Sequence, residues 1–223
     1  MPGITRRKMI GGMAGAPIAG ALMPRGDDRR QHPREFAPAE SGPEVMRKRF
    51  FPNVPLVTHE GKQVRFYDEL LKGKIVVLNL MYASCTDVCP TITAHLVKAQ
   101  KLLREVVKDQ VFFYSITVKP EQDTPGKLKE YAEMHGVGRN WLFLTGEPAD
   151  LERLRDRLGY RDPNPEKDKK DKAAHSGMLR YGNEPLSQWG SVQGGARPEW
   201  IAQEICFVIP GAPQHLDYQQ IGD

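Results

Sequence analysis

The sequence predicts an α/β domain in which a central sheet is flanked by helices and preceded by a β-hairpin. Residues 75–81 (IVVLNLM) form a continuous apolar run between short polar segments, as is typical of a buried strand. Residues 90–107 place apolar side chains at every third or fourth position, which one face of a helix requires. A second apolar run, 111–118, follows this helix. Strand, helix and strand in this order predict a βαβ unit.

The segments around this unit continue the alternation of strands and helices. Val54–Thr58 and Gln63–Phe66 flank the turn residues His59, Glu60 and Gly61, which predicts the N-terminal hairpin. After the βαβ unit we expect a helix at 124–135 capped by Asp123, a strand at 141–144 and a helix at 148–158 ended by Gly159.

The last third of the chain predicts a loop, a hairpin and a closing helix. Residues 161–172 (RDPNPEKDKKDK) are charged and lack an apolar face, so we expect a solvated loop. Residues 177–181 and 185–189 flank Gly182, Asn183 and Glu184, which predicts a second hairpin. Residues 198–207 predict a closing helix whose buried face includes Trp200, Ile201 and Ile205.

Composition divides the chain into four parts. In residues 1–23, the run TRRKMIG precedes a weakly apolar Gly/Ala-rich stretch and resembles a twin-arginine signal, which predicts export to the periplasm. The leader is either cleaved or kept as a weak membrane tether; the alternative is a disordered basic terminus. Residues 24–50 predict a flexible tether, 51–209 the folded domain and 210–223 a tail.

The charge distribution argues against a nucleic-acid-binding protein, and the lengths of the apolar runs argue against an ordinary transmembrane helix. The chain has 32 basic and 28 acidic residues, scattered along its length, which does not favour a nucleic-acid partner. No stretch approaches the ~20 apolar residues of an ordinary transmembrane helix, so we expect the folded domain to be soluble.

The chemistry is concentrated in the motif CTDVC, which contains Cys85 and Cys89. These cysteines lie between a predicted buried strand and a helix start, where backbone N–H groups and the helix dipole favour thiolates. Two soft thiolates select Cu(I) or zinc over hard ions and need a further ligand from elsewhere. The alternatives are a plain disulfide or a pair of buried thiols.

Three segments, LMYASCTDVCPTIT, PEQDTP and AHSGMLRYGNEPLSQW, together resemble the Sco/SenC family of copper chaperones. The resemblance implies a thioredoxin-like fold with a central mixed sheet, and a monomer. It further implies that Cys85, Cys89 and His175 bind copper, as Cu(I) or Cu(II). The acceptor it implies is cytochrome c oxidase subunit II, at its CuA site, or another copper protein. Considered alone, His175 would be a surface histidine at the end of a charged loop.

Two residues depart from the family pattern. Lys119 precedes Pro120 where family members usually have Asp, which would raise the positive potential near the site and favour thiolates. Thr86 replaces a frequent Pro, which should leave the CTDVC loop less stiff.

Other chemistry-bearing residues have simpler interpretations. We interpret Met81 and Met178 as core residues, Cys206 as a buried inert thiol, Asp87 as a helix cap, and the histidines at 32, 59, 95, 135 and 215 as solvated.

The leading functional hypothesis is copper binding and delivery, in which no substrate is turned over. The alternative is a thiol-disulfide oxidoreductase that uses Cys85 and Cys89 as its redox pair, although thioredoxins use the spacing CxxC. A peroxiredoxin-like peroxidase is disfavoured because the sequence contains no PxxxTxxC motif.

Overall fold

The computed structural model describes residues 42–170 and 177–216. The predicted leader (1–23), residues 24–41 of the predicted tether, His175 and residues 217–223 of the predicted tail lie outside the described residues.

The described residues form a seven-stranded mixed sheet in the order β2-β1-β5-β4-β3-β6-β7. The strands are β1 (Pro55–Thr58), β2 (Gln63–Arg65), β3 (Ile75–Met81), β4 (Val111–Thr117), β5 (Trp141–Thr145), β6 (Met178–Asn183) and β7 (Gln188–Gln193). Strands β3, β4 and β5 are parallel, and the other pairings are antiparallel. The predicted α/β class, mixed sheet and N-terminal hairpin are confirmed.

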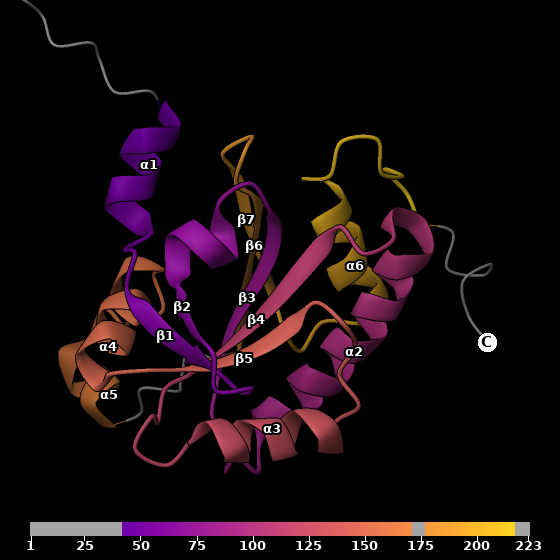
Figure 1. Ribbon diagram of the computed structural model, residues 1–223. Helices are drawn as coiled ribbons and strands as arrows, with labels where there is room; N and C mark the ends of the chain where they lie inside the picture. Colours follow the sequence, from indigo (N-terminus) through magenta and orange to yellow (C-terminus); the bar gives the residue numbers. More distant parts are fainter. Residues whose placement is uncertain (1–41, 171–176, 217–223) are drawn as a thin grey trace, which may run out of the picture. The chain divides into compact units, whose positions relative to one another are not determined.

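Helices cover both faces of the sheet (Figure 1). The helical segments are α1 (Gly42–Phe50), the π-helical segment η1 (Phe66–Leu71), α2 (Val88–Val107), α3 (Pro125–Met134), α4 (Pro148–Arg157), α5 (Pro165–Lys170) and α6 (Pro198–Cys206). Helices α2, α3 and α6 bury their apolar residues in the core on one face. Helix α4 and η1 contribute to the core on the other face.

A short chain of buried polar groups crosses the three parallel strands. Ser115 Oγ donates to Asn79 Oδ1 over 2.8 Å and accepts from Trp141 Nε1 over 2.9 Å. Asn79 and Ser115 are also direct partners in the register of β3 and β4. Because each of these buried groups has a partner, the apolar centre of the sheet tolerates them without a large desolvation penalty.

The second hairpin differs from the prediction in the position of its turn. Strand β6 continues through Gly182 and Asn183, and the turn occupies residues 184–187. Gly182 lies opposite Trp189, and a Cβ at Gly182 would lie 2.2 Å from the indole ring. This glycine therefore allows a close approach inside the strand instead of forming the turn.

The predicted solvated loop at 161–172 was wrong in its central part, where α5 begins at Pro165. Asp168 on α5 is 6% exposed and accepts bonds of 2.6 and 2.5 Å from the guanidinium of Arg155 on α4. Hydrogen bonds from Arg155, against the opposing effect of burial, hold the pKa of Asp168 well below its usual range. The segment that contains α5 is therefore held against α4 by a buried ion pair and not by an apolar helix face.

Three further details differ from the sequence expectations. Trp200 is 52% exposed, so it does not share the buried face of α6 with Ile201 and Ile205. Residues 42–50, at the end of the expected tether, form helix α1. In the expected tail, Leu216 is buried, and its N–H donates to Gln203 Oε1 on α6 over 2.7 Å. Among the described helices, none has the length and apolar character needed to cross a bilayer.

We predict that Asp168→Asn lowers the free energy of unfolding by about 3 kcal/mol at pH 7, because the buried Arg155 guanidinium then keeps only the partly exposed Glu152 as its counter-charge. The folded pKa of Asp168 is depressed, so its contribution is complete above the unfolded value of about 3.9 and declines as the pH falls below it. Urea unfolding from pH 3 to pH 7 should show the two proteins converging at low pH. The matched control is Asp156→Asn, whose exposed pair with Arg161 should contribute less than about 1 kcal/mol. An equal effect of both variants would contradict the prediction.

Candidate functional site

The two cysteines of the CTDVC motif lie at the carboxyl end of β3 and in the first turn of α2. Helix α2 begins at Val88, two residues earlier than predicted, so Cys89 is helical. Cys85 is 6% exposed and Cys89 2%, whereas the residues between them, 86–88, are exposed. Both thiols are therefore turned into the protein, and the loop between them faces solvent.

The two thiols form a hydrogen-bonded pair. Burial by itself raises the pKa of Cys85, but hydrogen bonds from the Cys89 side chain, the backbone N–H groups of Cys89 and Asp87, and the Tyr82 side chain outweigh it. The pKa of the Cys85 thiol is consequently lowered from its ordinary value. A low-pKa thiol is both a better metal ligand at neutral pH and a better nucleophile.

Asp123 holds the cysteine loop, a role that its local sequence does not indicate. Its carboxylate is 1% exposed and accepts hydrogen bonds from the Ala83 N–H, at 3.1 and 3.2 Å, and from the Thr117 hydroxyl. The predicted capping role was wrong, because Thr124 caps α3 by accepting from the Lys127 N–H. An acidic residue just before a helix is such a common cap that local sequence could not reveal the partner at Ala83.

Lys119 contacts the site through Tyr82. Its ammonium group lies 3.7 Å from the centre of the Tyr82 ring, a cation–π geometry. Tyr82 in turn hydrogen-bonds Cys85. The residue that departs from the family pattern therefore places its positive charge one side chain away from Cys85, as its position in the sequence suggested.

A pocket of about 630 Å³ opens beside Cys85. Its lining includes Cys85, Pro90 and Asp123 on one side and Tyr131, Met134 and His135 of the α3 region on the other. Met134 is 80% exposed. His135 was predicted to be solvated, but it is half-buried. The centre of its ring lies 4.2 Å from the centre of the Tyr131 ring. Cys85 is thus the thiol of the pair that a partner can approach.

The other residues singled out in the sequence have mixed outcomes. Met81 is buried in the core, and Cys206 is fully buried with its pKa raised to about 11 by burial, so both predictions are confirmed. Asp87 occupies the cap position of α2 but makes no side-chain cap bond. His59 is not free in solvent, because its Nδ1 accepts from the Phe143 N–H over 3.1 Å. His95 also departs from prediction, since its Nδ1 is buried.

The cysteine pair has no third acidic, histidine or cysteine ligand among the described residues, where no group of three or more such side chains could hold a metal. The predicted third ligand, His175, lies outside them. Strand β6 nevertheless begins nearby: in the β3–β6 register Leu78 opposes Arg180, so Met178 starts at the carboxyl end of β3, where the cysteine loop begins.

The glycine before β6 is linked to the start of α2. The Gly177 carbonyl accepts from the Gly194 N–H over 2.6 Å, and a Cβ at Gly194 would lie 2.9 Å from the Ile92 side chain. Ile92 is one turn beyond Cys89 on α2. The chain thus enters β6 beside the helix that carries Cys89.

Comparisons with known proteins indicate one family. The SCO1/SenC family model matches residues 44–205. A putative copper-binding protein of Stutzerimonas stutzeri is 31% identical over 167 residues, which cover 74% of this chain and 78% of the relative. A SCO1 protein homolog of Bacillus subtilis is 38% identical over 88 residues, 39% of this chain and 44% of the relative.

Solved structures show the same fold. The structure of Bradyrhizobium japonicum ScoI with copper bound is 27% identical, with a TM-score of 0.53 over 70% of this chain and 96% of that one. The structure of BsSco, described with a disulfide switch and as a member of the Sco family of cytochrome c oxidase assembly proteins, is 24% identical. Its TM-score is 0.56 over 68% of this chain and 88% of that one. The predicted thioredoxin-like fold is thereby confirmed.

We predict that Tyr82→Phe raises the pKa of the Cys85 thiol, because the variant removes one of the hydrogen bonds that stabilise its thiolate. The rate of Cys85 alkylation by iodoacetamide, followed by mass spectrometry from pH 5 to pH 10, should shift to higher pH. Tyr67→Phe removes a tyrosine hydroxyl that bonds Glu184 instead and serves as the control. Identical pH profiles for Tyr82→Phe and the wild type would contradict the assignment.

Proposed function

The chain belongs to the SCO1/SenC family, and we propose that it binds copper through Cys85, Cys89 and His175 and delivers it to an acceptor. The acceptor in this proposal is an extracytoplasmic copper site such as the CuA centre of cytochrome c oxidase subunit II. The proposal includes export by the twin-arginine route, on the basis of the leader-like composition of residues 1–23.

The observation that carries the proposal is the hydrogen-bonded pair of Cys85 and Cys89 at the start of α2. The two sulfurs come from one loop and one helical turn, so a single metal ion can reach both. Their donor type suits Cu(I), which prefers soft sulfur ligands. The lowered pKa of Cys85 reduces the cost of losing its proton when a metal binds.

Chain connectivity supports His175 as the third ligand. It precedes Gly177 by two residues, and two extended residues span at most about 7 Å. Gly177 is linked through Gly194 to Ile92 on α2. An imidazole starting from this point can approach the thiol pair, and imidazole is a ligand for both oxidation states of copper.

The pocket beside Cys85 supports delivery. A carrier must release its metal, so an acceptor ligand has to approach while the donor thiols still hold copper. Cys85 lines the open pocket, and Cys89 lies behind it in the first turn of α2. Stepwise exchange would therefore begin with displacement of Cys85 by an acceptor ligand.

We predict that the purified protein with one equivalent of Cu(II) shows thiolate-to-copper charge-transfer absorption, and that Cys85→Ser and His175→Ala weaken or abolish this band. Removal of one ligand leaves too few donors for the same geometry. His215→Ala is the matched control, because His215 is exposed near the end of the described chain. A His175→Ala spectrum identical to that of the control would remove His175 from the proposed site.

The second candidate function is thiol-disulfide exchange, and the lowered pKa of Cys85 is the observation that favours it. The Cys85 thiolate would attack a disulfide of the partner, forming a mixed disulfide and releasing one partner thiolate. Cys89 would then attack the Cys85 sulfur, closing a Cys85–Cys89 disulfide and releasing the second partner thiol. The two electrons pass from the cysteine pair to the partner, which would prepare an oxidised acceptor for copper.

We predict that Cys89→Ser traps a mixed disulfide on Cys85 when the reduced protein meets an oxidised two-cysteine peptide, whereas Cys85→Ser traps none on Cys89. The reason is that Cys85 combines the lowered pKa with a place in the pocket lining. Intact-mass spectrometry after acid quenching measures both adducts. Cys206 should stay unmodified in each sample, because it is fully buried and its pKa is raised. Equal trapping by the two variants would reject Cys85 as the attacking thiol.

A further inference from the structure

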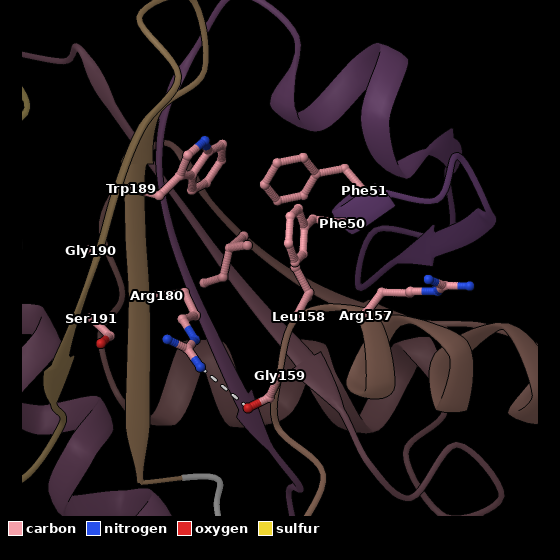
Figure 2. Close-up of a pocket in the computed structure, with 10 residues that line it drawn as sticks. Phe50, Phe51, Arg157, Leu158, Gly159, Arg180, Trp189, Gly190 and Ser191 are labelled. Carbon is pink, nitrogen blue, oxygen red and sulfur yellow. Dashed lines mark hydrogen bonds between the residues drawn. The ribbon is translucent and has the colours of Figure 1, made fainter. Parts of the chain in front are cut away.

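A second pocket of about 370 Å³ lies on the sheet face opposite the cysteine pair (Figure 2). Aliphatic and aromatic side chains make up most of its wall. They are Phe50, Phe51, Leu78, Leu158 and Trp189. Cys85 and Cys89 belong to the core on the other face, so this pocket is separate from the thiol site.

Aromatic rings form one wall of this pocket. Phe51 and Trp189 lie with ring centres 4.4 Å apart and planes tilted by 36°. Phe50 adds a third aromatic ring to the lining (Figure 2). The Trp189 indole is held against Gly182, where there is no room for a Cβ. These flat surfaces suit a flat apolar ligand.

Arg180 on β6 provides the charge in this pocket. Its Nη2 donates to the Gly159 carbonyl over 3.2 Å, whereas its Nε is buried without a hydrogen-bond partner. Among the described residues, no carboxylate forms an ion pair with it. The guanidinium also lies over the Tyr160 ring at 5.7 Å. Among the described residues, the Arg180 guanidinium thus has no carboxylate partner, and its Nε has no hydrogen bond.

Arg157, at the end of α4, also lines the pocket, but its side chain extends away from Arg180 in Figure 2. Its Nη1 contacts the Arg49 carbonyl at 3.5 Å. Arg180 lines the same pocket, and in Figure 2 its guanidinium lies below the aromatic rings and points toward Gly159. A ligand with one anionic group and one flat apolar body would match this arrangement.

We propose that this pocket binds a small aromatic carboxylate, with its ring against Phe51 and Trp189 and its carboxylate on Arg180. A cavity of about 150 Å³ accommodates benzene, so the volume here is sufficient for one or two fused rings. Guanidinium geometry matches a carboxylate, and a charge-assisted hydrogen bond is stronger away from bulk water. Such a site is independent of copper and adds a small-molecule ligand to the chain's chemistry.

The test compares two probes of equal shape by calorimetry on the full chain: 1-naphthoate and its neutral analogue 1-naphthalenemethanol. We expect saturable binding of 1-naphthoate and at least about tenfold weaker binding of the alcohol, because a hydrogen bond to a charged group is stronger than one between neutral groups. Equal affinities, or the absence of saturable binding, would overturn the proposal. This comparison needs no variant and does not depend on how any substitution folds.

Variants then locate the site. Arg180→Met should reduce the affinity for 1-naphthoate about tenfold, whereas Arg153→Met, an equal loss of charge at an exposed position on α4, should leave it unchanged. The indole N–H resonance of Trp189, assigned by its loss in Trp189→Phe, should shift when 1-naphthoate is added. An unshifted Trp189 resonance, or equal effects of the two arginine variants, would place the ligand elsewhere. Failure of this proposal leaves the copper proposal intact, since no residue is shared.

Discussion

The cysteine site depends on one buried carboxylate, that of Asp123. It joins the loop after β3, through the Ala83 N–H, to the end of β4, through the Thr117 hydroxyl, at the point where α3 begins. A buried carboxylate without donors would cost several kcal/mol, so these segments are held in the arrangement that supplies them. That arrangement brings Tyr82 to Cys85 and leaves Cys85 in the lining of an open pocket.

The central strands separate the chemistry of the two faces. Because side chains alternate along a strand, Val77 enters the core that contains both cysteines, whereas Leu78 enters the opposite core and lines the aromatic pocket. Strand β6 contributes side chains to both faces of the sheet. It starts at the cysteine end of the sheet, and Arg180, the register partner of Leu78, faces the aromatic pocket. The antiparallel pairing of β3 with β6 therefore positions both the start of β6 and the side chain of Arg180.

Periodic patterns predicted the elements well where burial is continuous along one segment. The limits of β3 agree with the predicted strand, and α2 follows the apolar spacing of its sequence. The predictions failed where a residue's conformation or burial depends on a contact with a residue far away in the sequence. Asp168 lies in a charged run, and its burial is favourable mainly because Arg155, on a neighbouring helix, donates two hydrogen bonds to its carboxylate. Gly182 suggested a turn in the sequence. In the structure this position needs a glycine because the Trp189 ring on the adjacent strand leaves no room for a Cβ, and neighbouring residues in the sequence do not indicate that contact.

The sequence by itself determined the α/β order, the position of the cysteine pair between a strand and a helix, and the family to which the chain belongs. These follow from local spacing and from motifs that are contiguous in the chain. Tertiary structure decided that Asp123 supports the loop, that Lys119 contacts the site through Tyr82, and that Arg180 Nε is buried without a hydrogen-bond partner among the described residues. Burial and pKa depend on atoms brought together from distant segments, so only the folded arrangement could reveal them.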